Sequence, residues 1–233
     1  MQINKPLAIY TSDPIKDIAH NRRIVYPVAQ EVILQRGLEI KDKELRALYF
    51  FLYLTGARIS EALKLKYGDI NIKSVDKHRY AEVRLITLKN RQKGLRFILI
   101  PLYIPLEAQM YAYFAEIYDH RINTVFKDVG TRNNVWFKLK NITYDTEVLD
   151  LKTKQRAEQE VRLHPHLLRH FRLSHLVTLY SYNAFELQDF AGWSNLNMAS
   201  IYVSMNTTAQ ANRFAAYPYM KQRIRINRGE AKS

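Results

Sequence analysis

The amino-acid sequence predicts a mainly α-helical protein that contains one small antiparallel β-sheet. Most of the chain carries apolar residues at every third or fourth position, which is the spacing of one helix face. Residues 79–88 and 95–102 are instead rich in β-branched side chains and flank a short polar segment, as the strands of a hairpin do. With 233 residues, 47% of them hydrophobic, the chain can bury a core and is expected to form one main domain.

Charge and cysteine content narrow the classes of function. Lys and Arg number 36 against 22 for Asp and Glu, and the formal net charge of +14 favours a polyanionic partner, nucleic acid before a membrane surface. Because cysteine is absent, disulfides, Cys-ligated zinc, iron–sulfur clusters and thiol catalysis are excluded. No stretch approaches the ~18 apolar residues of a membrane span, and no signal peptide is evident. A soluble, cytoplasmic protein without membrane partners is therefore expected.

The first half of the chain is expected to hold two helices and the hairpin. Residues 1–40 show no sustained periodicity and are interpreted as a lead-in or a remnant N-terminal segment. Residues 41–66 predict two helices separated at Gly56, so that Arg58 opens the second helix. The hairpin follows, with Lys89 at its turn.

The second half of the chain is expected to be helical. Apolar spacing, prolines near first turns and a break at Gly192 predict five helices, at residues 105–120, 132–142, 164–180, 183–193 and 195–205. Residues 143–160 are charged and lack a clear apolar face, so a loop or an exposed helix is expected there. The main domain is thus expected over residues 41–206, followed by a basic tail over 207–233.

Six side chains have the types needed for metal-free attack on a phosphodiester: Arg58, Lys89, His166, Arg169, Trp193 and Tyr202. On a helix, His166 and Arg169 are three positions apart and share a face, whereas Leu168 and Phe171 point toward a core. Two side chains that bind phosphate are therefore presented together.

These side chains make a coherent chemical set without a cofactor. The planar forks of Arg58 and Arg169 suit the non-bridging oxygens and neutralise charge as phosphorus becomes five-coordinate, in place of magnesium ions. Ionising a tyrosine such as Tyr202 at pH 7 costs roughly 4 kcal/mol, which nearby cations or a general base must offset. A lysine whose pKa is lowered by guanidiniums suits protonation of the departing 5′ oxygen, and Lys89 fits this role.

The sequence resembles the tyrosine recombinases, the family of phage integrases and of Xer-like and Cre-like enzymes. That family carries T-G-x-R-x-x-E, a hairpin lysine, H-x-x-R, and G-[HW] nine residues before a tyrosine, and this chain has all of them in order over about residues 40–205. The matching positions are Thr55, Gly56, Arg58 and Glu61, then His166 and Arg169, then Gly192, Trp193 and Tyr202.

The resemblance implies the catalytic-domain fold that tyrosine recombinases share with type IB topoisomerases. It implies that Tyr202 is the nucleophile, that the other five side chains are catalytic, and that Glu61 is an accessory residue. Trp193 stands where many members have histidine, and its indole N–H donates to a phosphate oxygen, which leaves the general-base role to His166.

Three further basic residues are predicted to contact DNA: Arg91, Lys93 and Arg172. Arg91 and Lys93 lie in the same turn as Lys89. Family members usually have a helical core-binding domain that closes a clamp around DNA, whereas a short lead-in precedes the matching region here. The chain is therefore interpreted as a catalytic-domain piece or as a minimal recombinase.

The function expected from this resemblance is site-specific DNA recombination or integration through a 3′-phosphotyrosine, independent of metal and ATP. The expected partners are double-stranded DNA and further copies of the chain, as a tetramer at synapsis, and the expected setting is the nucleoid, with a prokaryotic, viral or plasmid origin as part of a mobile genetic element. The alternatives are a type IB topoisomerase, which His166 disfavours because lysine is usual there, and a catalytically silent DNA-binding protein of the same fold.

Simpler roles compete for some of these residues. Arg58 and Glu61 suit a helix-surface ion pair. His164, His166 and His170 lack a carboxylate or cysteine at ligand spacing, so no metal site is expected and His164 and His170 are interpreted as structural. The basic tail suits either a solvated end or a contact with DNA or a neighbouring subunit.

Overall fold

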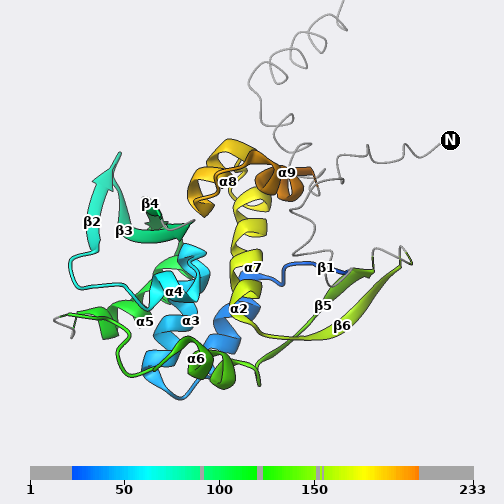
Figure 1. Ribbon diagram of the computed structural model, residues 1–233, viewed down its shortest axis with the longest axis horizontal. Coiled ribbons are helices and arrows are strands. Elements are labelled where there is room, and N and C mark those ends of the chain that lie inside the picture. Colours follow the sequence, from blue (N-terminus) through cyan, green and yellow to red (C-terminus); the bar gives the residue numbers. More distant parts are fainter. Residues whose placement is uncertain (1–22, 90–91, 120–122, 151–152, 154, 205–233) are drawn as a thin grey trace, which may run out of the picture.

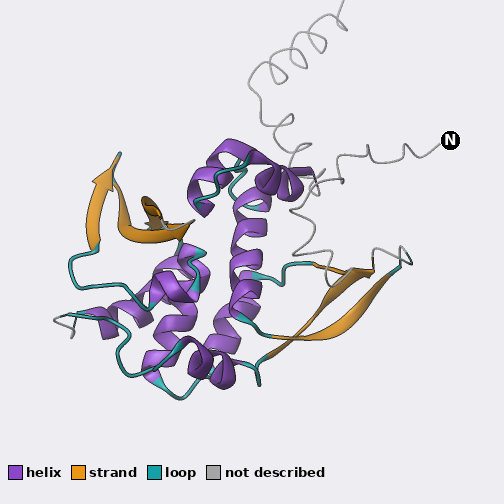
Figure 2. Ribbon diagram, viewed as in Figure 1, coloured by secondary structure: helices purple, strands orange, loops and turns teal. Residues whose placement is uncertain are grey.

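A computed structural model describes residues 23–204, apart from 90–91, 120–122, 151–152 and 154. Within this part of the chain, a group of helices lies between two small antiparallel sheets, one at each side of the view in Figure 1 and Figure 2. One sheet has the strand order β2-β3-β4 and the other β1-β5-β6. The predicted fold class, mainly α with a small antiparallel sheet, is confirmed, and a second sheet is added to it.

The helices are α2 (Gln30–Leu38), α3 (Lys43–Thr55), α4 (Ile59–Ala62), α5 (Pro105–Tyr118), α6 (Arg132–Leu139), α7 (Pro165–Thr178), α8 (Ala184–Ala191) and α9 (Leu196–Ser204). The strands are β1 (Arg23–Val25), β2 (Ile70–Val75), β3 (His78–Lys89), β4 (Gln92–Pro101), β5 (Thr143–Asp150) and β6 (Arg156–Arg162). The helices predicted from apolar spacing are confirmed, with ends shifted by a few residues.

Helix α3 is the centre of the hydrophobic core. Residues 47–54 are all fully buried, so α3 is apolar around its whole circumference and packs against α5 on one side and α7 on another. The helix begins at Asp42, whose carboxylate accepts from the backbone N–H groups of Glu44 and Leu45 at 3.0 and 3.1 Å. It ends at Gly56, which adopts the left-handed conformation with φ 56°. This ending places Arg58 at the start of α4.

The predicted hairpin is confirmed as β3 and β4, paired in register from Tyr80 opposite Pro101 to Lys89 opposite Gln92. Its inward-facing residues alternate with exposed ones, since Val83, Leu85 and Ile98 are buried. Strand β2, which pairs with β3 at one edge of the same sheet, was not predicted from the sequence.

The prediction of a loop or exposed helix over residues 143–160 is wrong. This segment forms β5 and β6, an antiparallel pair that runs from Thr143 opposite Arg162 to Leu149 opposite Arg156. Alternate residues of β5, Tyr144, Thr146 and Val148, are buried, which is the period of a strand with one covered face. The charged residues between them concealed this alternation in the sequence.

The described part of the N-terminal segment contributes to the same fold. Strand β1 pairs with β5, with Val25 opposite Val148, and α2 buries Ile33 and Leu34 in the core. Residues 1–22 and the basic tail at 207–233 lie outside the described residues. None of the described helices has the length and apolar character needed to cross a membrane.

Helices α7, α8 and α9 complete the core. The predicted orientation of α7 is confirmed for its apolar face, because Leu168 and Phe171 are fully buried. The predicted break at Gly192 is also confirmed: this residue ends α8 in the left-handed conformation, with φ 65°, and α9 folds back against α8. Both helices lie beside α7 (Figure 1).

Candidate active site

Glu61 is a buried carboxylate that holds two arginines. Its Oε2 accepts from the backbone N–H of Arg58 at 2.8 Å and from Nη2 of Arg96 at 2.8 Å, and its Oε1 accepts from Nη1 of Arg58 at 2.9 Å. Burial alone would raise the pKa of Glu61, but Arg96 and Arg58 together bring it below its ordinary value. Glu61 therefore stays ionised, and it fixes the start of α4.

Arg169 links the T-G-x-R-x-x-E motif to the end of helix α8, just before Gly192 and Trp193. Its guanidinium donates from Nη1 to the carbonyl oxygen of Gly56 and from Nη2 to that of Ala191, the latter at 2.7 Å. The side chain is buried, and its carbon Cζ lies 5.6 Å from the centroid of the Trp193 ring. Burial and the neighbouring cations Arg96 and Arg58 lower the pKa of Arg169 to about 9. Arg169 is thus still a cation at neutral pH.

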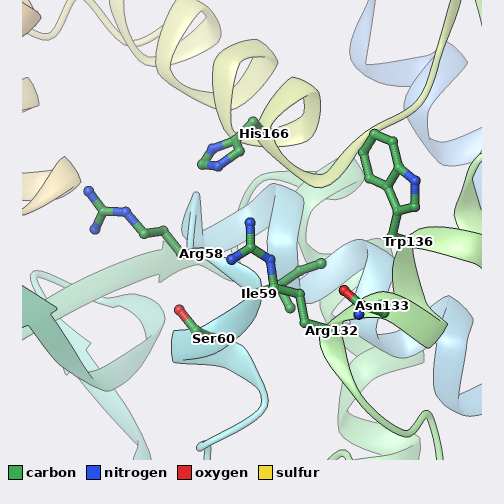
Figure 3. A pocket seen from close by; sticks show the side chains of 7 residues that line it. All are labelled: Arg58, Ile59, Ser60, Arg132, Asn133, Trp136 and His166. Carbon is green, nitrogen blue, oxygen red and sulfur yellow. The ribbon is translucent and has the colours of Figure 1, made fainter. Parts of the chain in front are cut away.

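A pocket of about 380 Å³ lies between α4, α6 and the start of α7. It is lined by Arg58, Ile59, Ser60, Arg132, Asn133, Trp136 and His166, and Figure 3 shows these side chains. The pocket brings together Arg58 and His166, which are distant in the sequence. Its volume lies within the range of roughly 300–1,000 Å³ that is usual for ligand sites.

Tyr202 belongs to an aromatic cluster whose other members, Trp193 and His170, do not line this pocket. Its ring stacks on Trp193, with centroids 5.8 Å apart and an interplanar angle of 24°. Its hydroxyl oxygen lies 3.2 Å from Nδ1 of His170. Tyr202 is only 8% exposed, and burial raises its pKa to about 12 although Arg169 acts in the opposite direction. In this arrangement the hydroxyl is protonated at neutral pH, and Tyr202 is not among the residues that line the pocket.

Arg172, predicted to contact DNA, does not reach the surface, so that prediction is wrong. Its side chain is 1% exposed and donates from Nη1 and Nη2 to the two carboxylate oxygens of Glu107, at 2.5 and 3.0 Å. The hydroxyl of Tyr180 also donates to Glu107. Arg172 is therefore part of a buried polar cluster between α5 and α7 and serves the core.

The hairpin residues are placed only in part. Lys89 is the last residue of β3, next to the turn, as predicted. The side chains of Lys89 and Lys93, and the whole of Arg91, lie outside the described residues, so their catalytic and DNA-binding roles remain predictions.

Several residues of the site were not predicted from the sequence. Arg132, Asn133 and Trp136 line the pocket from α6, where the only signal in the sequence was a basic and aromatic helix with no motif. His170, interpreted as structural, contacts the hydroxyl of the predicted nucleophile. His164 does have a structural role, because its Nδ1 accepts from the backbone N–H of Leu167 and caps α7.

Comparison with solved structures places this arrangement among known folds. The XerH site-specific recombinase bound to palindromic difH substrate is 18% identical, with a TM-score of 0.53, over 84% of this chain and 53% of that chain. The catalytic domain of bacteriophage HP1 integrase is 16% identical, with a TM-score of 0.52, over 84% of this chain and 96% of that one. A Tn1549 transposon integrase in complex with circular intermediate DNA is 18% identical, with a TM-score of 0.55, over 82% and 65%.

At these identities the similarity concerns the fold, and the chain spans about half the length of the XerH recombinase. No curated protein sequence matches the chain significantly. The sequence profile described as "Phage integrase family" matches residues 30–209, which includes both arginine motifs, the pocket and Tyr202. The chain therefore belongs to the phage integrase family and has the catalytic-domain fold of a tyrosine recombinase.

Proposed function

We propose that the chain cuts and rejoins DNA at specific sites, as a recombinase or integrase, through a covalent bond between Tyr202 and a 3′-phosphate. One observation carries the proposal: a histidine and two arginines from separate segments lie near one another, and one of the arginines also lies near a tyrosine. Arg58 and His166 line the pocket, and the charge of Arg169 acts on both the Glu61 cluster and Tyr202. Family membership supports this chemistry.

In the proposed reaction, Arg58 and Arg169 bind the non-bridging oxygens of the scissile phosphate. Each terminal nitrogen of a guanidinium carries two hydrogens, so Arg169 keeps a donor on both after serving the carbonyls of Gly56 and Ala191. The indole N–H of Trp193 is a further donor. The Tyr202 oxygen attacks phosphorus, the bond to the 5′ oxygen breaks, and Lys89 protonates that oxygen.

The reverse step rejoins DNA when the 5′-hydroxyl of another strand attacks the phosphotyrosine. Because each new P–O bond replaces one of similar energy, the cycle uses no nucleotide cofactor and, with two guanidiniums on the phosphate, no metal ion. Type IB topoisomerases use the same two steps on a single duplex, so the products distinguish the two activities.

The proposed partners are double-stranded DNA and other copies of this chain, assembled as a tetramer at synapsis. The net charge of +14 supports DNA, and two of the similar structures are described as DNA complexes. The proposed setting is the nucleoid of a prokaryote, or phage, plasmid or transposon DNA.

The experiment uses a suicide duplex, nicked near the cleavage point and carrying a site selected from random DNA. Incubation should give a covalent protein–DNA adduct that Tyr202→Phe abolishes. The matched control is Tyr67→Phe, which removes the hydroxyl of an exposed tyrosine and should leave the adduct unchanged. An adduct that survives Tyr202→Phe would refute the assignment, relaxation of a plasmid without recombinants would indicate a topoisomerase, and binding without an adduct would indicate a silent DNA-binding protein.

A further inference from the structure

His170 connects the N-terminal strand to the nucleophile. Its Nε2 lies 2.6 Å from the carbonyl oxygen of Val25 in β1, and its Nδ1 lies 3.2 Å from the hydroxyl oxygen of Tyr202 in α9. A carbonyl oxygen only accepts, so Nε2 carries a proton and donates it. In the neutral imidazole, Nδ1 then has a lone pair, and it accepts the hydrogen bond from Tyr202.

The surroundings of His170 favour this neutral form. Burial lowers the pKa of His170, and the hydrogen bond to Val25 only partly opposes this effect. Among the described side chains, the titratable groups that act on it are His164 and His175 on α7 and Tyr202 on α9, and the neighbouring Arg169 acts on Tyr202, whereas Val25 of β1 contributes a carbonyl oxygen. The pKa values of His164 and His175 are lowered to about 4, so both are neutral near pH 7. A neutral imidazole is a base that is ready to take a proton.

The other candidate base, His166, is placed differently. It is exposed and lines the pocket together with Arg58, and Tyr202 is not among the lining residues. Within the described part of the chain, the hydrogen bond of the Tyr202 hydroxyl goes to His170. The arrangement of carbonyl, imidazole and hydroxyl resembles the general order in which an activated nucleophile is held: an orienting group, a base and the nucleophile.

We propose that His170 is the general base that receives the proton of Tyr202 during DNA cleavage, while Val25 fixes the orientation of its ring. This inference rests on the proposed recombinase function and replaces His166 in the general-base role. His166 then acts on the phosphate from the pocket side.

The step balances as a proton transfer coupled to a displacement. The O–H bond of Tyr202 breaks and its proton goes to Nδ1 of His170, while the phenolic oxygen forms a bond to phosphorus. The bond from phosphorus to the 5′ oxygen breaks, and that oxygen takes a separate proton from the general acid. The imidazolium that forms donates from Nε2 to the Val25 carbonyl, which stabilises the positive charge. In the rejoining step, the proton returns from Nδ1 to the departing tyrosine oxygen.

The test is the rate of adduct formation by His170→Gln on the suicide duplex. Glutamine can bridge the same two partners through its amide but cannot take a proton at neutral pH. General acid–base catalysis contributes typically 10²–10⁴-fold, so we expect a loss of about 100-fold or more. The loss should persist on a duplex whose scissile 5′ oxygen is replaced by sulfur, because this leaving group needs no acid and the missing step is deprotonation of Tyr202.

Two further measurements separate catalysis from a structural role. His175→Gln is the matched control, because His175 also pairs with a tyrosine, at 2.8 Å from the hydroxyl of Tyr53, but outside the site. It should keep a nearly normal cleavage rate at equal thermal stability. A fluorinated tyrosine at position 202, which ionises more readily, should restore much of the rate of His170→Gln and change the unaltered protein far less.

Each outcome decides the inference. A near-normal rate for His170→Gln, rescue of its defect by the sulfur leaving group, or no rescue by the fluorinated tyrosine would overturn it. If His170→Gln unfolds, the fluorinated tyrosine can be tested in the otherwise unaltered protein. A general base at His170 predicts that the cleavage rate then depends less steeply on pH than it does with tyrosine at position 202. If one of these contradicting results is obtained and the unaltered protein still forms the adduct, only the role of His170 is overturned. If the unaltered protein forms no adduct, the proposed function is overturned as well.

Discussion

Arg132 lines the candidate pocket from α6, whereas Arg58 lines it from the start of α4. Figure 3 shows the guanidinium of Arg132 directed toward the side of the pocket where Arg58 and His166 lie. An exposed cation in this position is suited to a DNA phosphate at or next to the scissile one. We therefore expect Arg132→Gln to slow adduct formation roughly tenfold, the loss of about one charge-assisted hydrogen bond. Single-turnover kinetics on the suicide duplex would measure it.

Lys138→Gln is the control for overall charge, because Lys138 is on the same helix but faces Asp42, 3.5 Å away, and not the pocket. The position of the contact can be mapped with neutral methylphosphonates, since the defect of Arg132→Gln should vanish where its phosphate is already neutral. If Arg132→Gln and Lys138→Gln slowed adduct formation equally on every duplex, the effect of Arg132 would be a general electrostatic one and not a contact with a particular phosphate.

Removal of Arg172 should destabilise the fold strongly. Its guanidinium and the Glu107 carboxylate are both at most 1% exposed, so Arg172→Met leaves a charge without its partner in the core. Breaking a buried pair in this way costs about 3–5 kcal/mol. Unfolding in urea should show this loss, and Arg172→Met combined with Glu107→Leu should recover a large part of it.

Arg156→Met provides the comparison, because Arg156 forms an exposed pair with Glu147 at 3.5 Å and should cost less than about 1 kcal/mol. Similar losses for the exposed and the buried pair would show that Arg172 is not integral to the core.

Motif spacing identified Arg58 and His166 among the residues that line the pocket, but it did not identify the partners that hold the site residues in place. Arg58 and Glu61 are three positions apart, so their pairing was visible in the sequence. Arg172 and Glu107 are 65 positions apart, and no periodic pattern links them. The same limit explains His170, whose two partners come from β1 and α9. A side chain's chemistry can be read locally, whereas its partner depends on how distant segments pack.

Gly56 lies between the end of helix α3 and the start of helix α4. It ends α3 with a positive φ, and its carbonyl accepts from Arg169. An added Cβ would lie 3.2 Å from Cε1 of Phe190. We expect Gly56→Ala to cost about 1–2 kcal/mol through the left-handed backbone, to cost more through contact with Phe190, and to slow adduct formation because Arg169 shifts.

Gly68→Ala separates the two causes, since Gly68 also has a positive φ, of 90°, but an added Cβ there meets nothing within 4 Å. It should lower the melting temperature less and leave cleavage unchanged. Identical effects at the two glycines would mean that backbone strain alone accounts for Gly56.

At the level of elements, helices were predictable and the second sheet was not. Helix α3 shows its apolar character in every turn, and Asp42 and Gly56 mark its ends. Strand β6 has mostly exposed residues, so it offers no covered face to recognise. Strand β5 buries Tyr144, Thr146 and Val148, yet acidic residues separate them and Thr146 is polar. Backbone pairing with β1 and β5 stabilises these strands, and such pairing leaves little trace in composition.

At the scale of the whole molecule, stability should fall in mild acid. The folded state lowers the pKa of His164 and of His175 from 6.5 to about 4, in each case mainly through burial. Both side chains therefore bind protons more tightly when the chain is unfolded. Their stabilisation is complete above pH 6.5 and is lost as the pH falls toward 4, at up to about 1.4 kcal/mol per pH unit for each histidine. Thermal melting between pH 8 and 4 would measure this.

His164→Asn should flatten part of that dependence and preserve the fold at neutral pH. Asparagine is a good N-cap residue, so it can accept from the Leu167 N–H in place of the imidazole without titrating. The exposed His78 is the control, and His78→Asn should leave the acid dependence as it was. An unchanged profile for His164→Asn would assign the acid sensitivity to other groups.

The general architecture was predictable because the charge, the apolar spacing and the ordered motifs agree with one another. The arrangement of Tyr202 was not, since the nine-residue spacing from Trp193 says nothing about whether the hydroxyl faces the pocket. Its burial beside Trp193 and His170 depends on how α9 folds back after Gly192.

Because Trp193 stacks on Tyr202, its fluorescence can report on the position of the nucleophile. The chain has two tryptophans, one at the nucleophile and one, Trp136, in the wall of the pocket. Indole fluorescence responds to stacked rings and to nearby cations, so Trp136→Phe should leave an emission that changes only when Tyr202 moves relative to Trp193 and Arg169. Trp193→Phe should leave an emission that changes when DNA fills the pocket. Stopped-flow traces of the two variants would then time DNA arrival and nucleophile movement separately, and a single common rate would mean that the two events occur together.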